Sequence, residues 1–156
     1  MHQFKLTVIG LFCLLLLAGC GADRAADTPF TEELTQDILD SSAFTDTLDE
    51  LDGDTAWLLY GLDSSGLERQ NLTDCVVFRS AGATCEELAL LSFETDSQAA
   101  AALESLETYL QNQIESNESY RPQEIPKLEN AFLEQRSSTV LLVVSADTDC
   151  VKDLVG

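Results

Sequence analysis

A short apolar segment near the N-terminus decides how much of this chain is free to fold. Residues 6–17 (LTVIGLFCLLLL) are almost entirely apolar, and Ala18, Gly19 and Cys20 follow directly. A run of about twelve apolar residues suits the central region of an export signal, and it is shorter than the about 20 that a membrane-spanning helix needs. We therefore expect residues 1–19 to be a signal peptide that is removed from the chain.

The four residues that end this segment predict a covalent lipid anchor. Leu17-Ala18-Gly19-Cys20 resembles the bacterial lipobox, in which small residues admit the signal peptidase and the cysteine thiol is acylated. An ordinary signal peptide or an uncleaved anchor fits the order of these features less well. We expect lipid, palmitate included, to hold Cys20 at the extracytoplasmic face of the cell membrane, with residues 20–28 as the tether.

The charge of the chain excludes one large class of partners. It contains 28 Asp and Glu against eight Lys and Arg, which gives a formal net charge of −20. Proteins that bind nucleic acid rely on clustered Lys and Arg to displace counterions from phosphates, whereas the basic residues here are scattered. We therefore predict no nucleic-acid partner, and we expect the acidic surface to keep an anchored domain soluble.

The apolar pattern after the tether predicts a single α+β domain over residues 29–156. Its most distinct helix begins after a capping box of Thr95 and Gln98, and a strand pair flanks it on each side. We expect one four-stranded antiparallel sheet, built from two hairpins, with helices packed on it. The expected strands are 75–79, 87–93, 131–135 and 139–145, and the expected helices are 29–41, 95–114 and 148–155.

Three details of this reading depend on single residues. The first helix is expected to use Thr28 as its N-cap and Pro29 as its first residue. Residues 56–62 could form a helix or a strand, and Gly61 as a C-terminal stop favours the helix. The prolines between residues 120 and 126 predict a turn.

The first hairpin makes a prediction about cysteine chemistry. A four-residue loop over 80–83 would place Cys75 opposite Leu88. Cys85 would then lie three residues along the strand from the position opposite Cys75. That offset is about 10 Å along a strand, which is too far for a disulfide. We expect no bond between Cys75 and Cys85, with Cys150 as the better partner for either, unless all three thiols stay reduced.

Five segments carry a family resemblance: Tyr60–Asp63, Gly82–Ala89, Tyr120–Glu124, Lys127–Asn130 and Val140–Asp147. In their order and spacing the chain resembles an uncharacterised family of Gram-positive, Firmicutes-type bacterial lipoproteins classed as a domain of unknown function (DUF4358). The resemblance implies an extracytoplasmic location and one compact domain. It implies no catalytic residue, and the cysteines after residue 20 lie outside its pattern.

Side-chain chemistry after the signal peptide excludes the commonest catalytic designs. The only histidine is His2, so the rest of the chain has no group for a Ser-His-Asp triad, a Cys-His pair or a His-ligated metal. A Ser-Lys pair using Lys127 or Lys152 is conceivable but weakly indicated. Carboxylate pairs of the glycosidase type stay open. We predict no catalytic residue, no metal site and no cofactor.

One surface combines residues that are scarce in this chain. Tyr120, Arg121 and Lys127 place an aromatic ring and two cations on a turn, where binding groups often lie. With Asn130 and Glu87 they form the predicted partner or ligand surface. Alternatively, the two cations pair with carboxylates that hold the turn on the sheet: Glu124, Glu129 or Glu87.

These observations favour a non-enzymatic lipoprotein over an enzyme. We expect it to bind an envelope protein or a cell-wall component through its sheet or through the turn over residues 120–130. The alternative is a small cell-envelope hydrolase or ligand receptor that uses carboxylates, and this alternative requires a concave pocket.

Overall fold

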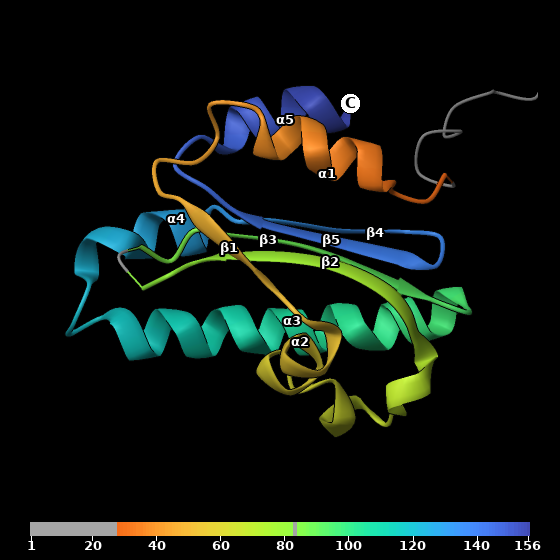
Figure 1. Ribbon diagram of the computed structural model, residues 1–156. Coiled ribbons are helices and arrows are strands. Elements are labelled where there is room, and N and C mark those ends of the chain that lie inside the picture. Colours follow the sequence, from red (N-terminus) through yellow and green to blue (C-terminus); the bar gives the residue numbers. More distant parts are fainter. Residues whose placement is uncertain (1–27, 83) are drawn as a thin grey trace, which may run out of the picture.

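Figure 1 shows the computed structural model of the chain, which describes residues 28–82 and 84–156. The predicted signal peptide, Cys20, most of the tether and Ala83 lie outside the described residues. The helices are α1 (Glu32–Leu39), α2 (Gly53–Leu59), α3 (Asp96–Asn117), α4 (Ile125–Glu129) and α5 (Thr148–Val155). The strands are β1 (Leu48–Leu51), β2 (Leu72–Ser80), β3 (Glu87–Phe93), β4 (Phe132–Arg136) and β5 (Thr139–Val144). In this part of the chain no helix is both long enough and apolar enough to cross a membrane.

The strands form one antiparallel sheet in the order β1-β2-β3-β5-β4. The α+β class and the single antiparallel sheet agree with the prediction, but the sheet has five strands instead of four. The added strand, β1, has the sequence LDEL, and its two central residues are exposed. Because β1 lies at an edge and carries so few apolar residues, its pattern resembles that of a solvent-exposed loop.

Helices cover both faces of the sheet, so the molecule has three layers (Figure 1). Alternate residues of β3 point to opposite layers: Leu88 and Leu90 pack with α1 and α5, while Ala89 and Leu91 pack with α2 and α3. Every residue of β5 is buried, which confirms the expected central strand. Helices thus pack on both faces of the sheet in the described part of the chain.

The longest helix, α3, confirms the capping box. The Thr95 hydroxyl accepts a hydrogen bond from the Gln98 backbone N–H at 3.3 Å, and the Gln98 side chain accepts one from the Thr95 N–H at 3.1 Å. Its buried stripe includes Ala99, Ala102 and Leu106, as predicted. Local hydrogen bonding and the apolar period thus agree along this helix.

The start of α1 differs from the prediction. Thr31, not Thr28, is the N-cap, and its hydroxyl accepts a hydrogen bond from the Leu34 N–H. Pro29 therefore precedes the helix. The backbone N–H of Phe30 is instead held by the Thr139 hydroxyl at 2.9 Å, at the beginning of β5. This long-range bond keeps the chain extended for one more turn than local signals suggest.

The short helix α2 ends as predicted. Its C-cap is Tyr60, and the next residue, Gly61, has φ +61, a left-handed conformation that favours glycine. Trp57 on this helix is buried in the core beneath the sheet. Residues 56–62 therefore contain a helix with a glycine stop, not a strand.

The β2–β3 hairpin has a different register from the one predicted. Arg79 pairs with Glu87 and Cys75 pairs with Leu91, so the connection runs over residues 81–86. The Ser80 hydroxyl accepts the N–H groups of Gly82 and Thr84 and thereby stabilises this longer loop. In the described part of the chain Cys75, Cys85 and Cys150 are all free, so no disulfide joins Cys75 to Cys85 and neither is paired with Cys150.

The segment expected to be a turn is mostly helical. Pro122 opens a short 3-10 helix, Pro122–Glu124, and Pro126 lies in the first turn of α4. Proline is tolerated in a first helical turn because the backbone N–H it lacks has no partner there. The two prolines thus mark helix starts instead of an irregular loop.

Candidate functional site

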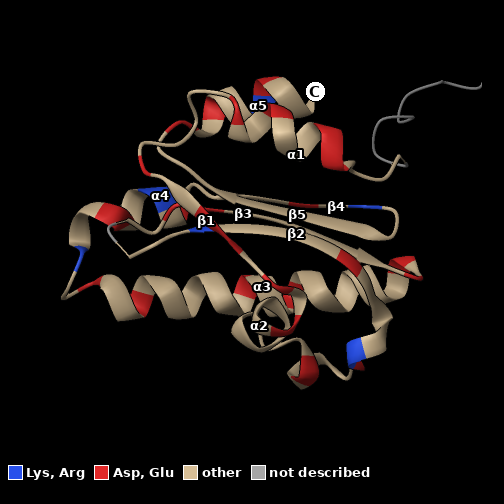
Figure 2. Ribbon diagram, in the orientation of Figure 1, with Lys and Arg blue, Asp and Glu red and all other residues tan. Residues whose placement is uncertain are grey.

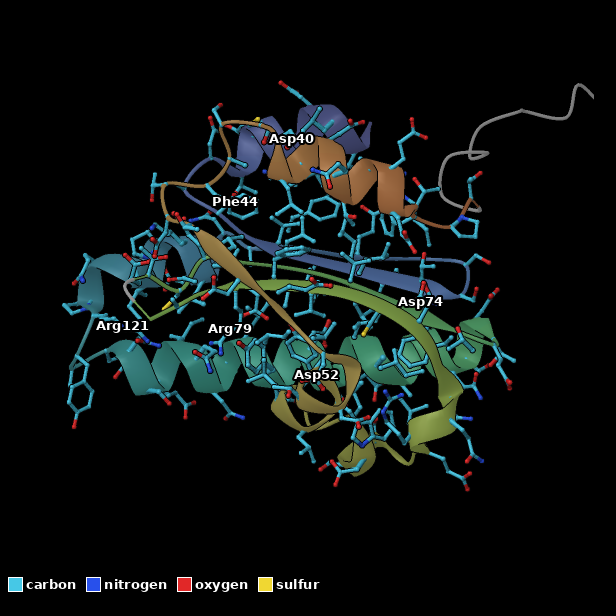
Figure 3. The ribbon with its side chains drawn as sticks, viewed as in Figure 1. Asp40, Phe44, Asp52, Asp74, Arg79 and Arg121 are labelled. Carbon is cyan, nitrogen blue, oxygen red and sulfur yellow. The ribbon has the colours of Figure 1, made fainter. Side chains whose placement is uncertain are left out.

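Glu87, at the start of β3, lies in a buried network beneath the sheet. One carboxylate oxygen accepts the Tyr60 hydroxyl; the other accepts the Tyr109 hydroxyl at 2.7 Å and the Arg79 Nε–H at 2.9 Å. Figure 3 labels Arg79 between the sheet and α3. The rings of Tyr60 and Tyr109 meet edge to face, with centroids 5.1 Å apart.

This network is structural in character. Burial raises the pKa of Glu87, and Arg79 and the two tyrosine hydroxyls offset part of that effect. Burial and the neighbouring carboxylate raise the pKa of Tyr60 and of Tyr109. Glu87 does not line either of the two pockets described below, and its partners occupy both of its oxygens. Glu87 therefore ties α2, α3 and the sheet together.

A second cluster surrounds Lys127 on α4. Its ammonium contacts Glu86 at 2.9 Å and Glu124 at 3.1 Å. Glu86 is completely buried and also accepts the N–H groups of Thr45 and Asp46, at 2.8 and 2.9 Å. The cluster therefore connects α4 to the segment that leads into β1.

The charges of this cluster stabilise one another. Burial alone would lower the pKa of Lys127, but its hydrogen bonds to Glu86 and Glu124 outweigh burial and raise that pKa. For Glu86, burial works to raise the pKa, and the hydrogen bonds from Thr45, Lys127 and the backbone outweigh it and lower the pKa. Both groups are charged at neutral pH, so this lysine cannot act as a general base there.

The structure separates Tyr120, Arg121 and Glu87 from the other two residues of the predicted surface. Arg121 lies at one end of the molecule (Figure 3), where its guanidinium donates to the Asn117 side chain at 2.7 Å and to the Gly82 carbonyl at 3.1 Å. Tyr120 is 86% exposed, and Glu87 lies in its own buried network. The alternative prediction, in which the cations hold the segment in place, describes Arg121 and Lys127 better. Lys127 pairs with Glu124, as that prediction expected, and also with Glu86. Arg121 binds none of the expected carboxylates and donates to Asn117 and to loop carbonyls instead.

Lys127 and Asn130, by contrast, line one pocket together. We call it the lysine pocket; it has a volume of about 320 Å³ between α4 and the start of α5. Its lining comprises Pro126, Lys127, Asn130, residues 145–149 and Lys152. The basic residues are few and most segments are acidic, but α4 and α5 each place a lysine here (Figure 2).

A buried hydroxyl without a partner lies at this pocket. Ser145 follows β5, is 2% exposed and lines the pocket, and its Oγ has no hydrogen-bond partner. Among the described residues it is the one buried side-chain polar atom that lacks a partner. A buried hydroxyl without a hydrogen-bond partner destabilises the folded state by about 1–3 kcal/mol. Such a group calls for a ligand or a water to complete it.

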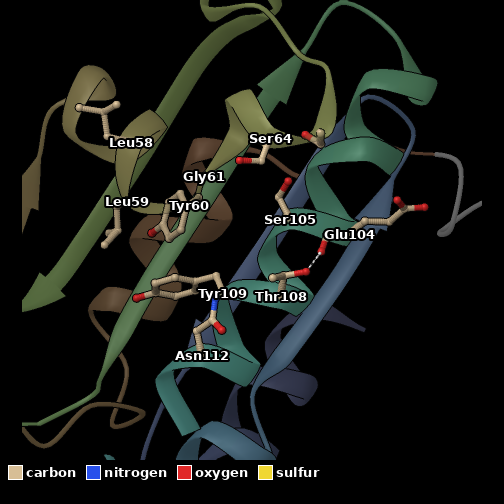
Figure 4. A pocket seen from close by; sticks show the side chains of 11 residues that line it. Leu58, Leu59, Tyr60, Gly61, Ser64, Glu104, Ser105, Thr108, Tyr109 and Asn112 are labelled. Carbon is tan, nitrogen blue, oxygen red and sulfur yellow. Dashed lines mark hydrogen bonds between the residues drawn. The ribbon is translucent and has the colours of Figure 1, made fainter. Parts of the chain in front are cut away.

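A second hollow, which we call the tyrosine groove, lies between α3 and the segment after α2 (Figure 4). Its volume is about 360 Å³, and its walls carry the hydroxyls of Ser64, Ser105 and Thr108. Tyr60 and Tyr109 form part of the lining, but both are at least nine-tenths buried and donate their hydroxyls to Glu87. The groove holds fewer charged groups than the lysine pocket, which is therefore the better candidate site.

Sequence reasoning missed two residues of this region: Glu86, which holds Lys127 in place, and Ser145, which lines the lysine pocket. Two adjacent glutamates at the start of an apolar strand were a usable signal, since buried carboxylates need partners. Ser145 ends the apolar run over 139–144, but no sequence pattern indicates that a serine hydroxyl will lack a partner. Among the described residues, no group of three His, Cys, Asp or Glu is arranged to hold a metal ion.

The comparisons with known proteins give one match. A family described as "Domain of unknown function (DUF4358)" matches residues 41–145, which contain all five strands and α2 to α4. No curated protein and no solved structure shows significant similarity to the chain. Since the matched region covers more than half of the sequence, the chain belongs to the DUF4358 family.

Proposed function

We propose that this protein is an extracytoplasmic lipoprotein, anchored by lipid on Cys20, whose domain binds an envelope component or partner protein without catalysis. The sequence Leu17-Ala18-Gly19-Cys20 supports the anchor. The strongest support for the binding role is the position of the lysine pocket relative to the point where the tether joins the domain.

The tether and the pocket lie at opposite ends of β5. Phe30, two residues after the tether, is held to Thr139 at the first residue of β5, and Ser145 follows the last. Six residues of strand separate these points by about 20 Å. Figure 1 shows the chain entering beside the β4–β5 turn, with α4 at the other end of the sheet. An anchor on the tether side would leave the lysine pocket facing away from the membrane.

The chemistry of the buried carboxylates supports binding over hydrolysis. Glu86, Glu87 and Glu124 each accept hydrogen bonds from groups that hold the fold together. A general acid needs a carboxyl that can reach a substrate proton. The alternative needs carboxylates in a pocket, and Asp147 and Asp149 of the lysine pocket could serve its ligand-receptor form.

The anchor is tested by metabolic labelling with an alkyne fatty acid. The wild type should incorporate the label and fractionate with membranes, whereas Cys20→Ala should lose the label and appear outside the membrane fraction. Ser105→Ala, a change on the far wall of the tyrosine groove, should behave as the wild type. Equal membrane retention of Cys20→Ala would refute the lipid anchor.

The orientation is tested by labelling intact cells with a membrane-impermeant maleimide. The reporter Lys152→Cys lies at the lysine pocket, and Thr28→Cys lies at the end of the tether. Both are made in a Cys75→Ser, Cys150→Ser background, since Cys75 and Cys150 are both half-buried. Lys152→Cys should react faster than Thr28→Cys in cells, and the two rates should become similar once the protein is released by Cys20→Ala. Preferential labelling of Thr28→Cys in cells would contradict the orientation.

A further inference from the structure

We propose that the lysine pocket binds a small zwitterion of the amino-acid type, a free amino acid or a dipeptide. The inference deepens the proposed binding function and rests on it, because it names the ligand class of the same site. Three properties of the pocket carry it: an incomplete buried hydroxyl, charged groups of both signs, and a small volume.

The Ser145 hydroxyl identifies the pocket as a place where a polar group is missing. It is almost fully buried and has no partner in the described part of the chain, although the serine lines the pocket. Folding around an unsatisfied hydroxyl is unfavourable unless something else completes it. The Oγ itself is sealed from solvent, so the Ser145 side chain must turn toward the pocket before a ligand carboxylate can accept this hydrogen bond.

Two ammonium groups are available for the same carboxylate. Lys127 has three N–H donors, of which Glu86 and Glu124 occupy two, and its side chain is 18% exposed. Lys152, on α5, is 60% exposed and holds Asp149 only loosely at 3.4 Å. Both lysines of the described chain therefore meet at one pocket.

Two carboxylates make the pocket unsuitable for a simple anion. Asp147 and Asp149 line it beside the lysines, and Glu86 and Glu124, which lie behind the lining, already pair with Lys127. Asp147 uses Oδ1 to cap α5 through the Cys150 N–H, and its other oxygen stays available. In a chain with a net charge of −20, an isolated anion would also be repelled. A ligand ammonium next to these aspartates satisfies both signs at once.

The size of the pocket limits the ligand. A volume of about 320 Å³ lies at the lower end of the range for small-molecule sites, about 300–1,000 Å³. One or two residues with small side chains fill such a space. Both ends of the ligand must then be free, because a longer peptide would carry its charges outside the pocket.

Isothermal titration of the full-length lipidated protein in detergent tests this inference with alanine, alanyl-alanine, two blocked dipeptides and inorganic phosphate. Alanyl-alanine should bind, and N-acetyl-alanyl-alanine and alanyl-alanine amide, each lacking one charge, should bind at least about tenfold more weakly. No heat with either alanine or alanyl-alanine would overturn the inference. Equal binding of the acetylated dipeptide or of inorganic phosphate would also overturn it, because the pocket would then be a plain anion site.

Variants separate a ligand site from a site completed by structural water. Ser145→Ala should weaken alanyl-alanine binding at least about tenfold and leave the unliganded melting temperature equal or higher, because an unsatisfied hydroxyl is removed. Lys152→Gln should weaken binding similarly, and Ser105→Ala in the tyrosine groove should change nothing. A lower melting temperature for Ser145→Ala would mean that water alone completes the hydroxyl, and it would overturn the inference.

The experiment distinguishes this inference from the proposed function. Dipeptide binding is measured on purified protein, and anchoring is measured separately through the fatty-acid label on Cys20. An anchored protein that binds no dipeptide refutes the ligand class alone. A protein that binds the dipeptide while Cys20→Ala stays in the membrane refutes the lipid anchor alone.

Discussion

Two adjacent glutamates illustrate how position decides the role of a residue. Glu86 and Glu87 are neighbours in sequence, and both are buried. Glu86 joins Lys127 and the segment before β1, whereas Glu87 joins Arg79 and two tyrosines beneath the sheet. Their pKa values shift in opposite directions, because hydrogen bonds dominate for Glu86 and burial dominates for Glu87.

Replacing Glu86 should destabilise the protein most at neutral pH. Glu86→Gln leaves Lys127 with one carboxylate and places an amide N–H₂ group next to other hydrogen-bond donors. We therefore expect the free energy of unfolding to fall by about 2–4 kcal/mol at pH 7. The folded pKa of Glu86 lies below its ordinary value of 4.5, so its contribution is present above that pH and is lost as the pH falls below it. Urea denaturation followed by Trp57 fluorescence, at pH 7 and pH 3, measures the difference. A loss of equal size at both pH values would contradict this cause.

Glu87→Gln should show the opposite pH trend. Because burial raises its folded pKa above 4.5, Glu87 contributes most below that value, and the contribution is lost as the pH rises through the folded pKa. The stability of the wild type relative to Glu87→Gln should therefore fall as the pH rises above 4.5. The same urea series measures it. As a control, Glu134→Gln, at a partly exposed ion pair on β4, should stay within about 0.5 kcal/mol of the wild type.

At the level of elements, helices whose ends have local signals match their predictions more closely than elements held by distant partners. α3 and α5 begin at predicted or adjacent residues because their caps are side chains within three positions. α1 also has a local cap, Thr31, but it starts later than predicted; Thr139, more than a hundred residues away in sequence, holds Phe30 just before it. β1 exists because β2 offers it a partner along Val77–Ser80.

The glycine stop after α2 gives a prediction at this scale. Gly61 has φ +61 with open space around its Cα, so a side chain there meets conformational strain without a steric clash. Gly61→Val should destabilise the protein by about 1–2 kcal/mol. Gly61→Asn should lose clearly less, since Asn tolerates the left-handed region. Thermal unfolding of both variants provides the measurement, and equal losses would point to packing instead of backbone strain.

At the level of the whole molecule, negative charge is distributed over all three layers (Figure 2). Few basic residues oppose it, and most of them form ion pairs with specific carboxylates. The remaining acidic side chains repel one another in the compact state more than in the extended chain. The fold therefore carries an electrostatic cost that dissolved salt can reduce.

Salt should accordingly stabilise this protein. Raising NaCl from 10 mM to 150 mM shortens the Debye length from about 30 Å to about 8 Å, which screens repulsion between distant carboxylates. The free energy of unfolding should rise, whereas the short buried pairs of Lys127 should be affected little. KCl should act as NaCl does, because screening depends on ionic strength. A decrease in stability with salt would show that attractive surface pairs dominate.

The sequence by itself determined the helices with local caps, the buried central strand, the α+β class and the family. The helices depend on the spacing of apolar residues and on hydrogen bonds between residues within four positions, as at Thr95 and Gln98. It did not determine β1, the hairpin register or the lysine pocket. Lys127 meets Glu86 across 41 positions, and Ser145 lacks a partner only because of how α4 and α5 pack. Such contacts depend on tertiary packing, because no local pattern specifies which distant groups approach one another or which buried group is left without a partner.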